Sequence, residues 1–113
     1  IQTALRRPAL KHVHHLRIAD LVVDIESRST LRGDRWIDLS TREFDLLATL
    51  VRRPKRVFTR EELLDLVWGI DRDVSPATVE TYISYLRAKV DRAPDPRLIH
   101  TVRGVGYTIR EPR

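Results

Sequence analysis

The sequence predicts an α+β fold in which an N-terminal antiparallel sheet of up to four strands precedes three helices and a C-terminal β-hairpin. Three observations support this prediction: apolar residues at strand spacing in residues 16–39, two helix-start signals between residues 40 and 62, and a glycine-containing turn within residues 98–110. A chain of 113 residues is long enough for one domain with a modest core.

The composition is that of a globular protein and narrows the chemistry open to it. Hydrophobic residues make up 42% of the chain, which is ordinary. There is no cysteine, so disulfides, thiolate metal sites and cysteine nucleophiles are excluded. No apolar segment is long enough to span a bilayer and no signal peptide is visible, which favours a cytoplasmic location without membrane contact. We predict no cofactor and no metal site, because the histidines near the N-terminus have no carboxylate beside them.

Positive charge is concentrated towards the C-terminus. The net charge is +5, and residues 75–113 hold seven basic residues against four acidic ones, a balance of +3. A basic C-terminal third favours a polyanionic partner such as nucleic acid. A generally basic soluble protein is the alternative, and charge alone does not decide between them.

The expected strands fall in residues 16–39. Residues 16–18 alternate in polarity, and residues 21–23 form a β-branched segment. Residues 29–32 and 35–39 flank Gly33 and Asp34, a pair typical of a tight hairpin. We expect the helices that follow to cover one face of this sheet.

The first two helices each begin with a capping box. Ser40 with Glu43 starts the first helix, and Thr59 with Glu62 starts the second. The first carries an apolar stripe and ends near Pro54, whereas the second is short and stops at a glycine. A basic cluster after the first helix either contacts phosphate or is a solvated helix end: Arg52, Arg53, Lys55 and Arg56.

The third helix, residues 75–90, is the element around which the chain is organised. Ser75 is a good N-cap, and Pro76 suits the first helical position. Its apolar stripe consists of Val79, Ile83, Leu86 and Val90. Its other face carries small and hydroxyl-bearing side chains, which suit either a DNA major groove or an ordinary surface helix. The helix alone favours the surface interpretation.

The order of elements changes that balance. Strands, two short helices, a longer helix and a hairpin make a winged helix-turn-helix, in which the third helix enters the major groove and the hairpin lies beside it along the duplex. Gly104 and Gly106 lie between two strands with no helix after them, so they do not form a dinucleotide-binding loop.

Five motifs in this order resemble the effector domain of OmpR/PhoB-type response regulators. They are LSTREFDLL (39–47), VFTREELL (57–64), WG (68–69), TVETYISYLRAK (78–89) and TVRGVGY (101–107). By this resemblance, residues 16–113 form the DNA-binding domain, and residues 1–15 match a linker and the end of an upstream receiver domain. The chain has no methionine and begins at Ile1, which we interpret as removal of that receiver.

The resemblance implies a transcription factor of a two-component phosphorelay. A sensor kinase would phosphorylate a receiver aspartate outside this chain, and two effector domains would bind a direct-repeat promoter site as a dimer. We expect the isolated domain to be a monomer. A winged helix that binds protein is the alternative, but the basic residues around the third helix and wing argue against it. We do not expect an enzyme, since no nucleophile–base or carboxylate pair stands out.

The resemblance places five side chains opposite bases: Ala77, Thr78, Thr81, Ser84 and Tyr85. Thr78 and Thr81 each offer a hydroxyl to a base edge and a methyl group to thymine. Some relatives carry arginines at the positions of Ala77, Ser84 and Tyr85. We therefore expect modest intrinsic affinity and more reliance on the wing, DNA shape and dimerisation.

Nine further residues are predicted to contact phosphate or the minor groove: Arg60, Trp68, Tyr82, Arg87, Lys89, Thr101, Arg103, Gly104 and Tyr107. Arg103, at the wing tip, resembles the arginine that enters a narrow A·T-rich minor groove. For Trp68, packing in the core is an equal alternative to phosphate contact. Tyr107 is a plausible backbone contact, and its alternative is also a place in the core.

The loop between the second and third helices contains Asp71, Arg72 and Asp73. In relatives this loop can contact RNA polymerase. A solvated turn is at least as good an interpretation here.

Overall fold

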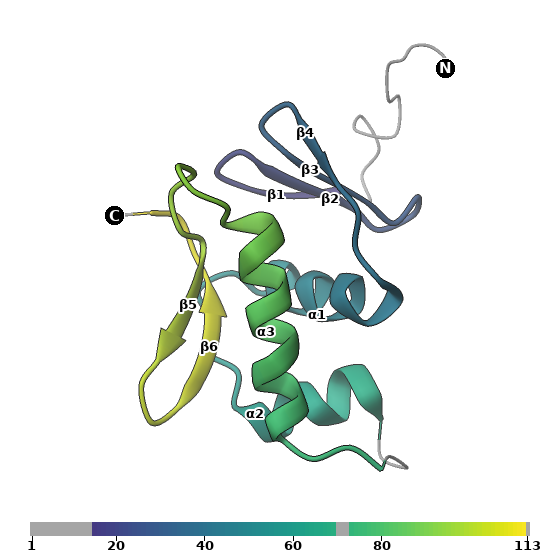
Figure 1. The fold of residues 1–113 in the computed structure, drawn as a ribbon, viewed down its shortest axis with the longest axis vertical. Coiled ribbons are helices and arrows are strands. Elements are labelled where there is room, and N and C mark those ends of the chain that lie inside the picture. Colours follow the sequence, from purple (N-terminus) through teal and green to yellow (C-terminus); the bar gives the residue numbers. More distant parts are fainter. Residues whose placement is uncertain (1–14, 70–72, 113) are drawn as a thin grey trace.

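The computed structural model describes residues 15–69 and 73–112, and its elements follow the predicted order (Figure 1). The antiparallel sheet consists of β1 (His15–Ile18), β2 (Leu21–Asp24), β3 (Ser29–Arg32) and β4 (Arg35–Ile37). The helical part consists of α1 (Thr41–Arg52), α2 (Arg60–Leu63), the π-helical turn η2 (Leu64–Trp68) and α3 (Ala77–Val90). The hairpin is formed by β5 (Ile99–Val102) and β6 (Gly106–Ile109). The predicted α+β winged helix-turn-helix is therefore confirmed.

The sheet covers one side of the helical core. Its strands are neighbours in chain order, β1-β2-β3-β4, and Gly33 makes the predicted β3–β4 turn with φ 63°. Leu21 and Val23 alternate along β2 towards the core and are fully buried. The predicted linker, residues 1–15, lies outside the described residues except for His15, which already belongs to β1.

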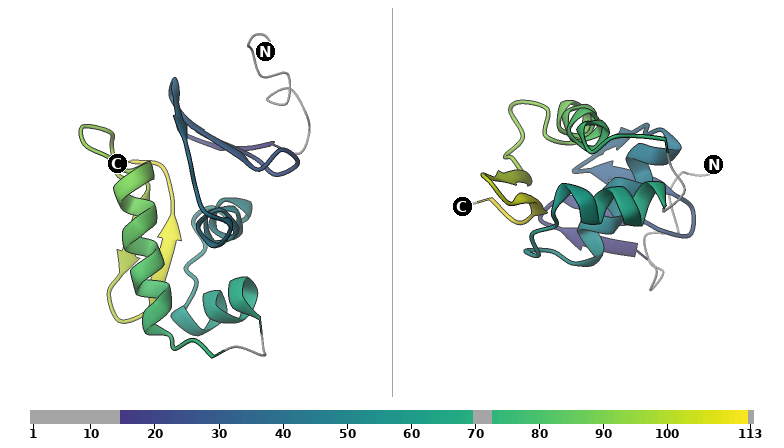
Figure 2. Two further views of the ribbon diagram at one scale, coloured as in Figure 1. Left: turned by 45° about the vertical axis from the view of Figure 1, so that its right-hand side comes forward. Right: turned by 90° about the horizontal axis from the view of Figure 1, so that it is seen from below.

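α1 is the central helix of the core. Its predicted capping box is present: the Glu43 backbone N–H donates to Ser40 Oγ at 3.2 Å, and the Ser40 N–H donates to Glu43 Oε1 at 2.9 Å. α1 packs against β1, η2, α3 and β6. Figure 2 shows α3 and the hairpin on one side of α1. α3 and β6 therefore both pack against α1.

The second helix is more irregular than its sequence predicts. The capping box of Thr59 and Glu62 is present, but α2 is one turn long and continues as the π-helical turn η2, which Gly69 ends with φ 87°. A π-helical turn is wider than an α-helical one, so side chains three apart no longer share a face. Leu66 accordingly stands 60% exposed, although Leu63 is buried.

The predicted cap of α3 is wrong. Pro76 occupies the N-cap position without a side-chain hydrogen bond, and α3 begins at Ala77. The backbone satisfies the helix start instead: the Thr78 N–H donates to the Ser75 carbonyl at 2.9 Å, and the Val79 N–H to the Pro76 carbonyl at 3.0 Å. The predicted apolar stripe of α3 is confirmed, since all four of its residues are buried.

Arg32 connects the sheet to the end of α3. It is only 2% exposed, and its guanidinium donates to the Val90 carbonyl, to Asp91 Oδ1 and to the Pro96 carbonyl at 2.6, 3.1 and 2.6 Å. Nε donates to Asp20 Oδ1 at 2.6 Å. A cation at this place also interacts favourably with the partial negative charge at the C-terminus of α3.

Asp91 carries the connection on to the wing. Its Oδ1 accepts from the Leu98 N–H and its Oδ2 from the Ile99 N–H, both at 3.0 Å. Arg35 adds a parallel link, because it donates to the Lys89 carbonyl at 2.8 Å and to Asp95 Oδ2 at 2.5 Å. The sheet, the end of α3 and the start of β5 are thus connected by one polar network centred on the buried Arg32 and Asp91.

The base of the wing is fixed to the segment before α2. The Phe58 N–H donates to the Tyr107 carbonyl at 2.8 Å, and the Tyr107 N–H donates to the Phe58 carbonyl at 2.9 Å. Gly106 makes this approach possible, because a Cβ atom there would overlap the Phe58 carbonyl group and lie 2.9 Å from Thr59 Cα.

Replacing Arg32 by lysine should lower the free energy of unfolding by roughly 3 kcal/mol, the scale of one or two lost hydrogen bonds to a charged group. A single ammonium cannot span the acceptors that the planar guanidinium reaches. Urea unfolding measures the change, with Arg17→Lys on the exposed part of β1 as the control. Equal stability of the two variants would contradict the role given to Arg32.

Replacing Gly106 by alanine should cost about 1–3 kcal/mol of stability, because the added methyl group forces the wing away from Phe58. Val105→Ala, one residue earlier and exposed, is the matched control. Thermal unfolding distinguishes them, and a Gly106→Ala melt that matches the control would show that the wing has no such close approach.

Candidate nucleic-acid interface

The outer face of α3 is exposed and carries no positive charge of its own. Ala77, Thr81, Ser84 and Tyr85 are exposed, with Tyr85 at 48%, and Thr78 lies half-buried at the border. The Thr81 hydroxyl donates to the Ala77 carbonyl at 3.4 Å, which leaves its oxygen able to accept from a partner. All five predicted base-facing residues therefore lie on or beside one accessible surface.

Aromatic side chains form one border of this surface. The Trp68 and Tyr82 rings lie 5.2 Å apart between centroids, and those of Tyr82 and Tyr85 lie 5.4 Å apart, both edge to face. The Arg42 guanidinium stands 5.9 Å from the Trp68 ring and donates to the Val67 carbonyl at 2.6 Å. Trp68 and Tyr82 are half-buried against the core, so packing is one role that the structure gives them.

The wing forms the opposite border. Arg87 donates from Nε to the Ile99 carbonyl at 3.2 Å and from Nη2 to Thr101 Oγ1 at 2.5 Å. Burial lowers the pKa of Arg87, followed by repulsion from Arg97, but a guanidinium remains charged in proteins. Two of the predicted phosphate contacts are thus joined, and Arg87 links α3 to β5.

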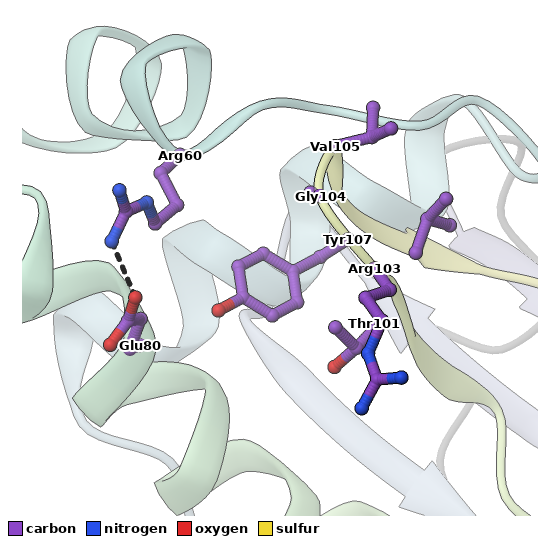
Figure 3. A pocket seen from close by; sticks show the side chains of 9 residues that line it. Arg60, Glu80, Thr101, Arg103, Gly104, Val105 and Tyr107 are labelled. Atoms are coloured by element: carbon purple, nitrogen blue, oxygen red, sulfur yellow. Dashed lines mark hydrogen bonds and ion pairs between the residues drawn. The ribbon is translucent and has the colours of Figure 1, made fainter.

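A pocket opens between α2, α3 and the wing (Figure 3). Arg60, Thr101, Arg103 and Tyr107 line it, and Arg60 forms an ion pair across it with Glu80. Tyr107 is largely buried, and burial, followed by the charge of Glu80, raises the pKa of its hydroxyl. Tyr107 is therefore both a core residue and part of the pocket wall.

The wing tip is accessible and positively charged. Gly104 adopts φ 77°, and Arg103 and Val105 on either side of it are exposed. Within residues 15–69 and 73–112, Arg103 has no ion-pair partner. The tip thus presents an exposed guanidinium at the wall of the pocket.

Two sets of predicted contact residues do not lie at this pocket, namely Lys89 and the loop before α3. Lys89 lies near the other end of α3, where its ammonium donates to Glu43 Oε1 at 2.7 Å. Burial raises the pKa of Glu43, but hydrogen bonds from Lys89 and Ser40 outweigh it, so the net pKa is lowered. Of the proposed polymerase loop, Asp73 is exposed, whereas Asp71 and Arg72 lie outside the described residues.

Glu80 is the functional candidate that the sequence interpretation missed. It is the one carboxylate in α3 and lies one helical turn before Ser84. The sequence could have indicated this, because Glu80 is three residues after Ala77 and four before Ser84, and residues at these spacings share a helix face.

Three further features concern the described part of the chain. It contains no group of three or more possible metal ligands, and none of its helices has the length and hydropathy needed to cross a bilayer. His100 Nε2 is buried without a hydrogen-bond partner there, and burial together with Arg110 lowers its pKa.

Comparison with known proteins places this geometry in a family. Residues 33–109, which include α1 to β6, match the family described as "Transcriptional regulatory protein, C terminal". The chain belongs to this family. It is a family of transcription regulators and not a class of enzymes, and the resemblance to OmpR/PhoB-type response regulators is confirmed.

Individual members of the family agree with this assignment. The response regulator MprA of Mycobacterium leprae is 47% identical over 96 residues, which are 85% of this chain and 42% of that protein. MprA of Mycolicibacterium vanbaalenii is 48% identical over the same length. The chain therefore spans about two fifths of the length of these relatives.

Solved structures give the same result. DrrB of Thermotoga maritima, an OmpR/PhoB homologue, superposes with a TM-score of 0.77 at 33% identity, covering 86% of this chain and 44% of DrrB. The RstA DNA-binding domain of Klebsiella pneumoniae, solved in complex with the RstA box, has a TM-score of 0.74 at 31% identity and covers 85% of this chain and 96% of that domain.

Proposed function

We propose that this domain binds double-stranded promoter DNA, with α3 in the major groove and the β5–β6 wing at the minor groove. The observation that carries the proposal is the placement of the exposed face of α3 beside an accessible wing tip, whose Arg103 has no ion-pair partner among the described residues. A winged helix-turn-helix docks on DNA through these two surfaces. The structure of the RstA domain with its box, at 96% coverage of that domain, supports the same use here.

The outer face of α3 and the arginines at its borders have different roles in the proposed complex. The outer face of α3 offers hydroxyl and methyl groups from Thr78 and Thr81, which suit base edges and thymine methyl groups. Positive charge comes from its borders, where Arg60 and Arg103 line the pocket and Arg87 is hydrogen-bonded to Thr101. Phosphate contacts give affinity and register, whereas base contacts give sequence preference. In this proposal α3, which carries little positive charge, contacts the bases, and the arginines at its borders contact the phosphates.

The remaining residues predicted to contact phosphate differ in how far their polar groups are already packed or hydrogen-bonded. Trp68 and Tyr107 present an indole N–H and a hydroxyl from largely packed rings, and Thr101 offers a hydroxyl already shared with Arg87. Lys89 is the weakest candidate, because its ammonium is bonded to Glu43 at the far end of α3.

The domain functions, in this proposal, as the output part of a larger cytoplasmic regulator. Residues 1–15 would connect it to a receiver domain whose phosphorylation drives dimerisation. Two domains would then occupy a direct repeat, whereas the isolated domain is a monomer without enzymatic activity. The segment that includes Asp71, Arg72 and Asp73 would be available to RNA polymerase. Support comes from the match to response regulators that are longer than this chain.

Binding to a duplex selected from a random DNA pool should weaken steeply with salt, by about 0.9 in the log–log slope for each phosphate neutralised. Arg103→Ala should weaken binding about tenfold, the scale of one lost charge-assisted contact, chiefly at sites with an A·T-rich flank. Fluorescence anisotropy at several salt concentrations measures both effects.

Arg17→Ala is the matched control, since it removes one exposed arginine from β1, far along the chain from α3 and the wing. It should leave the affinity nearly unchanged. A flat salt response, or equal losses for Arg17→Ala and Arg103→Ala, would contradict phosphate-led binding through the wing.

A further inference from the structure

Glu80 is an unexpected residue on a surface that binds a polyanion. It lies in the first turn of α3, and its side chain is 51% exposed. A carboxylate at this place repels phosphate, and like charges across an interface oppose binding. If electrostatic repulsion were its only effect, removing Glu80 would strengthen DNA binding.

The contact made by Glu80 indicates a different role. Its Oε2 accepts a hydrogen bond from Arg60 Nη1 at 2.5 Å, across the pocket between α2 and α3 (Figure 3). Arg60 is the first residue of α2, and its side chain is 42% exposed. Among the described residues, Glu80 is the one acidic partner of Arg60. Without it, the long arginine side chain would sample many rotamers in solvent.

The bonded guanidinium keeps donors for a second anion. A guanidinium carries five N–H donors, and the contact with Glu80 occupies Nη1. The others remain beside Thr101, Arg103 and Tyr107, which line the same pocket. This arrangement leaves room for a carboxylate on one edge of the guanidinium and a phosphate on another.

We infer that Glu80 is a positioning residue that holds Arg60 ready to receive a DNA phosphate at the pocket between α2, α3 and the wing. This inference rests on the proposed DNA-binding function. Fixing the arginine before DNA arrives removes most of the entropy lost when a free side chain is immobilised at an interface. Glu80 and the phosphate both face water, which weakens their direct repulsion, and the inference requires the ordering of Arg60 to outweigh that repulsion.

A double-mutant cycle tests the inference. The affinities of wild type, Arg60→Ala, Glu80→Ala and the double variant are measured by anisotropy on a duplex selected by the wild-type domain from a random pool. Arg60→Ala should weaken binding about tenfold and lower the salt slope by about 0.9, as expected for one lost phosphate contact. Glu80→Ala should weaken binding about fivefold, because the two residues act as one unit. The double variant should bind as Arg60→Ala does or slightly more tightly, since without Arg60 only the repulsion by Glu80 is left to remove.

Two further variants separate positioning from general charge effects. Glu80→Gln keeps a carbonyl oxygen that accepts from Arg60, so it should restore part of the affinity lost in Glu80→Ala. Glu61→Ala removes a neighbouring exposed carboxylate of α2 that has no ion pair among the described residues, and it should leave binding equal or slightly tighter. Thermal unfolding of each variant verifies that the fold is intact.

The inference is overturned if Glu80→Ala binds as well as wild type or more tightly, or if the effects of Arg60→Ala and Glu80→Ala add in the double variant. Absence of DNA binding by the wild-type domain would instead overturn the proposed function itself. The two failures are therefore distinguishable in one experiment.

Discussion

The buried guanidinium of Arg32 is the interaction on which the geometry of this domain depends. It reaches from β3 to the last carbonyl group of α3, to Asp91 and to the turn before β5. An unpaired buried arginine is strongly unfavourable, so the fold is stable only when these partners are assembled together. One side chain thereby fixes the N-terminal sheet, the end of α3 and the start of β5 relative to one another.

This constraint explains how a helix with little charge can belong to a nucleic-acid interface. The network fixes α3 at its C-terminus, and the contact between Phe58 and Tyr107 fixes the wing at its base. The pocket that lies between them collects Arg60 and Arg103 from different elements. Positive charge is therefore supplied by neighbouring elements, whereas the exposed face of α3 carries small polar groups, which in the proposed complex approach bases.

Local patterns predicted most of the fold, because each depends on residues close in the sequence. The capping boxes at Ser40 and Thr59 and the apolar stripe of α3 are of this kind. The Arg32 network was not predictable, since its partners in α3 and before β5 lie 58–64 residues away. A polar residue in a short strand is, in addition, normally expected to be exposed. The candidate site was predicted through the family resemblance, but the pairing of Arg60 with Glu80 depends on how α2 packs against α3.

The central claim is that α3 and the wing form one continuous DNA-binding surface held by the core. Titrating the selected duplex into the isotope-labelled domain and following backbone amide chemical shifts tests it directly. The claim predicts large shifts in two regions, residues 77–85 and 101–105, with small shifts in the sheet β1–β4. Shifts concentrated on the groove around Leu66 between α1 and η2, with α3 and the wing unchanged, would contradict it.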